Sequence, residues 1–120
     1  MPTETAIDQS RLRQTIARLM DLLARRDYSA FCGSARRSRL TPLDVDAAVR
    51  GYGRTIIAPP ADAFRLLDVV AVIDSIPPRW SVVVPLWTEQ EGRSDLSLEI
   101  TVEDADGPDY AVEIEDLHVL

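Results

Sequence analysis

The first part of the chain repeats its apolar residues with the period of an α-helix. Between residues 8 and 26 the apolar side chains recur at spacings of three and four and form one stripe, made of Leu12, Ile16, Leu19, Met20 and Leu23. A second helix is predicted over residues 42–53. Thr41 is its expected N-cap, and Asp44 stands where a capping box needs an acidic residue. Each helix is therefore expected to bury one side and to leave the other in water.

From about residue 64 onward the period changes to two, which predicts strands. Four strands are expected, at residues 65–74, 79–88, 95–103 and 109–119. The third alternates apolar with polar residues, which is typical of a strand with one buried face. In the fourth, Ile114 and Leu117 have opposite parity. We favour a β-bulge near Glu115 and Asp116, which restores both to one face, over a strand that leaves the sheet at its end.

Together these elements predict an α+β fold in one domain, residues 1–120, with the N-terminal helices packed on one face of a curved four-stranded antiparallel meander. Residues 28–33 suggest a short helical turn, and residues 34–39 look like an exposed basic loop. Asp106 and Gly107 form the strongest hairpin signal. A chain of 120 residues is long enough to bury about two thirds of the surface that it exposes when unfolded.

Charge narrows the functional classes. The net charge is −7, and it is unevenly divided: residues 1–54 carry ten arginines and six acidic residues, whereas residues 55–120 carry three arginines and fourteen acidic residues. A net negative chain is a poor nucleic-acid binder, because phosphate contacts need a basic surface. The acidity therefore serves solubility or offers a surface to a basic protein partner.

The sequence also predicts a location. No apolar run approaches the ~20 residues of a membrane helix, so no membrane contact is expected. The first residues lack the basic region and the apolar segment of a signal peptide. A single cysteine, Cys32, excludes an internal disulfide and fits a reducing compartment. We therefore expect a cytoplasmic protein.

Few residues offer catalytic or metal-binding chemistry. Cys32 and His118 are the only cysteine and histidine, and a catalytic pair would need them adjacent in space. The acidic stretch 103–109 lacks the closing glutamate of a calcium-binding loop, and no zinc-ligand spacing or phosphate loop is present. We expect no metal, no cofactor and no enzymatic activity. A general acid–base role for Asp116 or His118 in a sheet-lined pocket is the alternative.

Two features, a charged turn and an apolar strand face, each have a structural and a functional interpretation. The turn at residues 89–95 needs Gly92 for its geometry, and its charges guard the sheet against aggregation; alternatively, Arg93 belongs to a recognition surface. Trp87 and Val83 lie on the strand face opposite the helices. That face needs a cover, which the sheet's curvature, the C-terminus, a partner or a second copy of the chain could supply.

Most of the chain resembles an uncharacterised family of small bacterial proteins, a domain of unknown function. The resemblance rests on "PPRWSVVVPLWTEQEGRSDLSLEITV", "YAVEIEDLHVL" and "VRGYGRTIIAPP". The order of helices before a curled meander, with "LLARRDYSAF" closing the first helix, is also similar to NTF2-like and cystatin-like α+β folds. Such folds host enzymes, pockets and interaction modules alike, so the resemblance implies no activity.

These features favour a small acidic interaction module that binds a basic protein partner through its sheet, in the manner of immunity proteins that neutralise toxins. An NTF2-like protein that binds or converts a small molecule in a pocket is the first alternative. A structural homodimer that packs sheet on sheet is the second. The candidate binding residues are Tyr52, Arg54, Trp87, Arg93, Glu99, Glu113, Asp116 and His118.

Overall fold

A computed structural model describes residues 6–119, apart from the side chain of Leu66. Within the described residues of the N-terminal half lie three α-helices: α1 (Gln9–Ala24), α2 (Tyr28–Gly33) and α3 (Pro42–Tyr52). The predicted apolar stripe of α1 is confirmed, because all five of its members are buried. The predicted capping box of α3 is confirmed as well. The Thr41 hydroxyl accepts from the Asp44 N–H, and the Asp44 carboxylate accepts from the Thr41 N–H.

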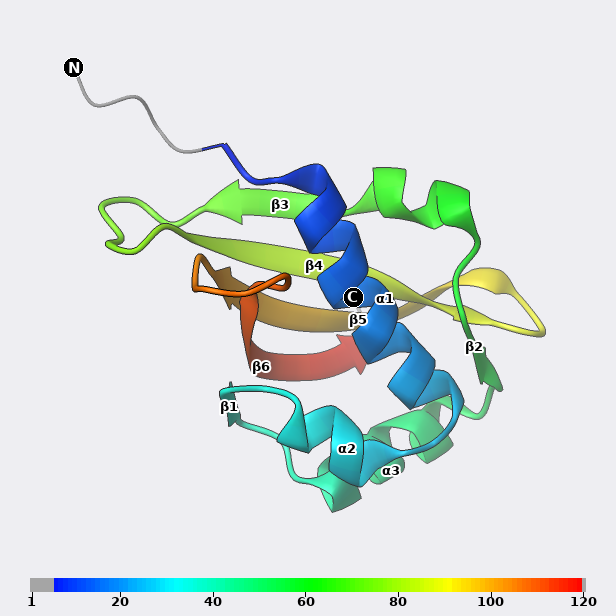
Figure 1. The fold of residues 1–120 in the computed structure, drawn as a ribbon. Coiled ribbons are helices and arrows are strands. Elements are labelled where there is room, and N and C mark those ends of the chain that lie inside the picture. Colours follow the sequence, from blue (N-terminus) through cyan, green and yellow to red (C-terminus); the bar gives the residue numbers. More distant parts are fainter. Residues whose placement is uncertain (1–5, 120) are drawn as a thin grey trace.

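The described strands form one curled sheet. They are β1 (Arg37–Ser38), β2 (Ile56–Ile57), β3 (Asp68–Ala71), β4 (Arg79–Thr88), β5 (Gly92–Glu103) and β6 (Ala111–Val119). Their order is β1-β6-β5-β4-β2, and β3 pairs with β4 on the side that β2 also uses. The α1 helix crosses one face of the sheet, and α2 and α3 lie beside β1 and β6 (Figure 1).

The predicted α+β class is confirmed, but the antiparallel meander is only part of the sheet. The supposed basic loop at residues 34–39 contains β1, which pairs in parallel with β6. The Arg36 N–H donates to the Val112 carbonyl at 2.8 Å. The Arg39 N–H donates to the Ile114 carbonyl at 2.9 Å. A strand of two residues has no periodicity to read, and its basic side chains hid its place in the sheet.

The strand predicted over residues 65–74 is shorter than its apolar run. Its first residues belong to a 3-10 helix, η1 (Ala61–Leu66), which begins directly after Pro60. The last backbone bond to β4 runs from the Val72 N–H to the Arg79 carbonyl, at 2.9 Å. Ile73 lies beyond that bond, in the turn that leads to β4. The apolar residues at the end of the run therefore lie beyond the hydrogen bonds that pair β3 with β4.

The predicted β-bulge in β6 is confirmed. The neighbours Glu99 and Ile100 on β5 pair with Asp116 and Ile114, so that Glu115 is left without a partner. The apolar residues on either side of the bulge, at positions 114 and 117, are both buried. One extra residue thus keeps the apolar side of β6 continuous.

The core lies between α1 and the inner face of the sheet, which we define as the face toward α1. The sheet contributes alternate residues of three strands: Trp80, Val82, Val84 and Leu86 of β4, Leu96, Leu98, Ile100 and Val102 of β5, and Val112, Ile114 and Leu117 of β6. Phe31 of α2 and Val45 of α3 close the core and are fully buried. In the described part of the chain, no helix has both the length and the apolar character that a bilayer crossing requires.

Leu98 is fully buried at the centre of β5, as the alternation predicted. Leu98→Ala is expected to lower the free energy of unfolding by about 2–5 kcal/mol, the range for truncating a buried leucine. Leu43→Ala is the matched control, because Leu43 is 80% exposed, and it should change stability by less than about 0.5 kcal/mol. Urea unfolding of both variants measures the difference. Equal effects would contradict the assigned faces of β5.

Candidate functional site

The outer face of the sheet, opposite α1, carries the polar side chains that alternate with the core residues. On β4 the first of these outward positions is Arg79, and on β5 the first is Arg93. On β6 the bulge decides which side chains belong to this face. If Glu115 took part in regular pairing, Asp116 and His118 would point toward α1. The bulge instead sets Asp116 opposite Glu99 and turns both β6 residues outward.

One end of the outer face holds a buried carboxylate among arginines. We call this the Glu113 cluster; its members are Arg36, Arg37, Arg79, Glu103 and Glu113. Glu113 is only 5% exposed. Its Oε2 atom lies 2.7 Å from Arg36 Nη2, and its Oε1 atom lies 2.7 Å from Arg79 Nη2. Arg37 Nη2 lies 3.1 Å from the same Oε1 atom, and Arg36 also pairs with Glu103.

The cluster stays ionised at neutral pH. Hydrogen bonds from Arg36 hold the pKa of Glu113 below its ordinary value, against the opposing effect of burial. The same guanidinium lowers the pKa of Glu103. Because β1 places Arg37 directly beside Glu113, the cluster also holds the N-terminal half against the last strand. Its first role is therefore structural.

Glu113 was expected to contribute to an exposed acidic surface, and the structure corrects this. Its carboxylate is covered by three guanidinium groups and offers no free charge to a partner. Glu103 is engaged in the same cluster, and Glu115 lies 3.4 Å from Arg39 Nε. The alternation of apolar and polar residues predicts which face of the sheet each side chain occupies. It does not predict that the short strand β1 brings arginines to the outer face.

Three other predicted residues meet near the middle of the outer face. His118 Nε2 lies 3.0 Å from Glu99 Oε2 and 3.9 Å from Asp116 Oδ2. Their side chains are between 38% and 49% exposed. The three ligand-type atoms lie within 4.8 Å of one another. We call these residues the Glu99 triad.

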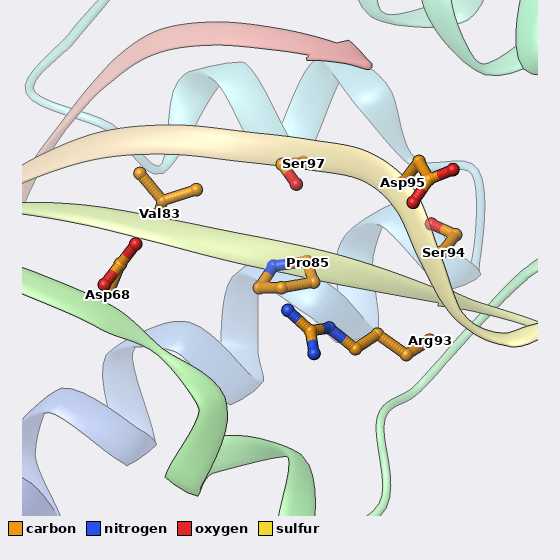
Figure 2. Close-up of a pocket in the computed structure, with 7 residues that line it drawn as sticks. All are labelled: Asp68, Val83, Pro85, Arg93, Ser94, Asp95 and Ser97. Carbon is orange, nitrogen blue, oxygen red and sulfur yellow. The ribbon is translucent and has the colours of Figure 1, made fainter. Parts of the chain in front are cut away.

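Beside the triad the outer face is hollowed, with a volume of about 390 Å³. Its lining residues are Asp68, Val83, Pro85, Arg93, Ser94, Asp95 and Ser97 (Figure 2). Arg93 lies along the sheet next to Pro85, and among the described residues it has no carboxylate within ion-pair distance (Figure 2). The Ser94 hydroxyl is already engaged, because it donates to the Leu86 carbonyl at 2.9 Å. The hollow is broad and open rather than closed around a ligand.

Of the four remaining candidates, three hold the turn between β4 and β5. The Tyr52 hydroxyl donates to Glu91 Oε2 at 3.0 Å, and Arg54 Nε lies 3.6 Å from Glu91 Oε1. Trp87 is half-buried, and its ring lies over Gly92, where a Cβ atom would be 3.5 Å from Cζ3. Gly92 also adopts a φ of 75°, which favours glycine. Tyr52, Arg54 and Trp87 thus secure the turn, whereas the fourth candidate, Arg93, lines the hollow.

A pocket between helices and sheet is one alternative, and one described space between them is almost filled by side chains. The space lined there by Ile16, Phe64, Leu67 and Val84, among others, has a volume of about 10 Å³. That is about the least that a water molecule needs. Cys32 is half-buried, which raises the pKa of its thiol and disfavours the nucleophilic thiolate.

A feature that the pattern did not reveal lies at the β3 edge. We define the β3 edge segment as residues 68–76. It carries four exposed apolar side chains: Val70 (63%), Val72 (40%), Ile73 (85%) and Ile76 (95%). Counting residues 65–74 as one paired strand concealed this exposure. The clue in the sequence was an apolar run that continues straight into a proline-rich turn.

Fold and surface together define a small α+β protein with a helix-covered sheet, a salt-bridged outer face and an exposed apolar edge. The chain belongs to the family described as Domain of unknown function (DUF7668), whose model matches residues 20–120. The predicted membership of an uncharacterised family is thereby confirmed. No curated protein and no solved structure matches the chain.

The Glu113 cluster predicts a specific acid sensitivity. Glu113→Gln should lower the free energy of unfolding at pH 7 by about 2 kcal/mol, between the ~0–1 kcal/mol of exposed ion pairs and the 3–5 kcal/mol of fully buried ones. Because the folded pKa of Glu113 is depressed, the unfolded state binds more protons, and the wild-type advantage is lost as pH falls through that pKa. Urea unfolding between pH 7 and about pH 3 should therefore show the two proteins converging in acid.

Glu115→Gln supplies the control, with the same charge change two residues away on β6. Glu115 pairs with the largely exposed Arg39, so its replacement should cost less than about 1 kcal/mol at any pH. Equal stability of wild type and Glu113→Gln at neutral pH would contradict the structural role of the cluster.

Proposed function

We propose that this protein is a binding module that adds a strand of a basic protein partner to its sheet, along β3. The observation that carries the proposal is the exposure of large apolar side chains in the β3 edge segment. Soluble chains rarely leave several such residues together in water unless the patch makes a contact. Ile73 and Ile76 are the most exposed large apolar side chains recorded among the described residues.

The backbone of β3 supports strand addition. Hydrogen-bonded and non-bonded pairs alternate in an antiparallel ladder, and Val72 donates to Arg79 on β4. Val70 and Asp68 therefore also bond to β4, whereas the peptide groups of Val69 and Ala71 point away from it. In the described part of the chain no strand pairs with that other side. The free groups are what an extended peptide needs for β-augmentation.

Charge favours a basic partner over a second copy. Asp68 and Asp74 are both exposed and bracket the apolar centre of the segment. If two copies paired antiparallel about Ala71, Asp68 of one would face Asp74 of the other, and like charges opposite one another are unfavourable. Two chains of net charge −7 also repel. An apolar strand with arginine or lysine at its ends meets the same surface without that penalty.

A small-molecule role is the second candidate, and the hollow on the outer face supports it. Its volume of about 390 Å³ lies within the ~300–1,000 Å³ of ligand sites. Arg93 would give it a preference for anions. It ranks second because it is open to solvent and because most of its polar groups are short side chains on the sheet surface. Homodimers through Val83 and Trp87 have weaker support, since both residues are half-buried.

The test uses an extended peptide of alternating valine and threonine with basic ends, and the same peptide with acidic ends. We expect the basic peptide to bind, with amide NMR shifts concentrated at residues 68–76, and the acidic peptide to bind at least about tenfold more weakly. Ala71→Pro should abolish binding, because it removes an outward N–H that β4 does not use. Its fold is checked by circular dichroism.

Two comparisons make this test selective. Leu43→Arg changes an equally exposed apolar residue on α3 and should leave peptide affinity unchanged. Shifts centred on Arg93 and Ser97 with small anions, and none at β3 with peptides, would favour the second candidate. If the wild-type protein sediments as a dimer and Ala71→Pro sediments as a monomer, the partner of β3 is a second copy of the chain and not a basic protein.

A further inference from the structure

Two acidic residues on the outer face differ from Glu113 in how their charge is balanced. Glu99 and Asp116 stand directly opposite each other on β5 and β6. Carboxylates in that position repel. At one end of this face, by contrast, arginines neutralise Glu113. Among the described residues, no arginine lies within ion-pair distance of Glu99 or Asp116, and the side chain beside them is the imidazole of His118.

The backbone holds these three side chains in a fixed arrangement. Asp116 and His118 are two residues apart on one strand and therefore share a face. Glu99 comes from the neighbouring strand at the register position of Asp116. All three stand on strands of the sheet rather than on loops, which favours a precise ligand geometry. A spread of 4.8 Å between ligand atoms is close enough for one ion to draw them together.

We propose that the Glu99 triad binds a divalent zinc ion. Its donors are one imidazole nitrogen and two carboxylate oxygens, and zinc accepts both kinds at about 2.0–2.2 Å. Imidazole favours zinc over magnesium or calcium, which prefer all-oxygen sites. A divalent ion would also cancel the charge of the two facing carboxylates. Three protein ligands leave the fourth position of a tetrahedral site to water or another ligand. The hollow lies nearby, since His118 pairs with Ser97 and Glu99 with Val83.

The test is a zinc titration of the purified, chelator-treated full chain by calorimetry. We expect one zinc ion per chain. The NMR resonances of His118 should shift on binding, and their assignment is unambiguous because the chain has one histidine. His118→Gln, Glu99→Gln and Asp116→Asn should each weaken binding by about 10- to 100-fold or more, since even loss of a residue that supports a ligand costs that much.

Two controls separate this site from adventitious binding. Glu115→Gln removes one negative charge from the adjacent bulge residue, and Cys32→Ser removes the only thiol; both should keep the wild-type zinc affinity within about twofold. Zinc binding that Cys32→Ser abolishes, or that His118→Gln leaves unchanged, would overturn the proposal. So would the absence of any zinc-dependent heat or shift. Because the triad is separate from the β3 edge segment, peptide binding by the three ligand variants should be unaffected.

Discussion

A carboxylate removed from water, Glu113, organises much of this molecule. Three guanidinium groups surround it, two from the N-terminal half and one from β4. A buried charge is tolerated only when partners satisfy it, so Glu113 needs the arginines that β1 brings beside β6. The short strand β1 has only two residues and little ladder of its own. Its place is fixed by this electrostatic contact together with the backbone bonds on either side.

The same kind of contact explains the uneven charge of the sequence. Six arginines of residues 1–54 pair with acidic residues of the second half: Arg11 with Asp104, Arg18 with Asp109, Arg36 with Glu103 and Glu113, Arg37 with Glu113, Arg39 with Glu115 and Arg54 with Glu91. The division between a basic and an acidic half is thus largely an internal match. Among the described acidic residues that have no arginine partner are Glu99 and Asp116 of the triad and the two aspartates that bracket β3, Asp68 and Asp74.

Periodicity was sufficient to predict the elements with long patterns. The stripe of α1, the capping box at Thr41 and the alternation of β5 each depend on local physics that the sequence displays directly. The bulge followed from parity alone, because Leu117 had to return to the core. Periodicity failed where an element was too short to repeat, as for β1 and β2. It also failed where an apolar run outlasted its ladder, as at Val72 and Ile73.

Site prediction had a different limit. Glu99, Asp116 and His118 were each identified as candidates, but nothing in the linear order brings position 99 to position 116. Only the register of β5 against β6 does so. Conversely, Glu113 looked like its acidic neighbours, and only the pairing of β1 revealed that its charge is consumed. The face of the sheet that a side chain occupies can be inferred from alternation, whereas its neighbours on adjacent strands cannot.

The bulge at Glu115 bears on how related chains can differ in length. Deleting that residue would leave a regular strand in which Leu117 still faces α1 and Asp116 and His118 still face outward. Deleting Asp116 has the same effect, because Glu115 then takes its place. Deleting Val112 or Ile114 would instead put an acidic residue, Glu113 or Glu115, at a core position. Within the family, a single-residue gap in β6 should therefore be found at Glu115 or Asp116, because a gap at an inward-facing position would not preserve the core residues.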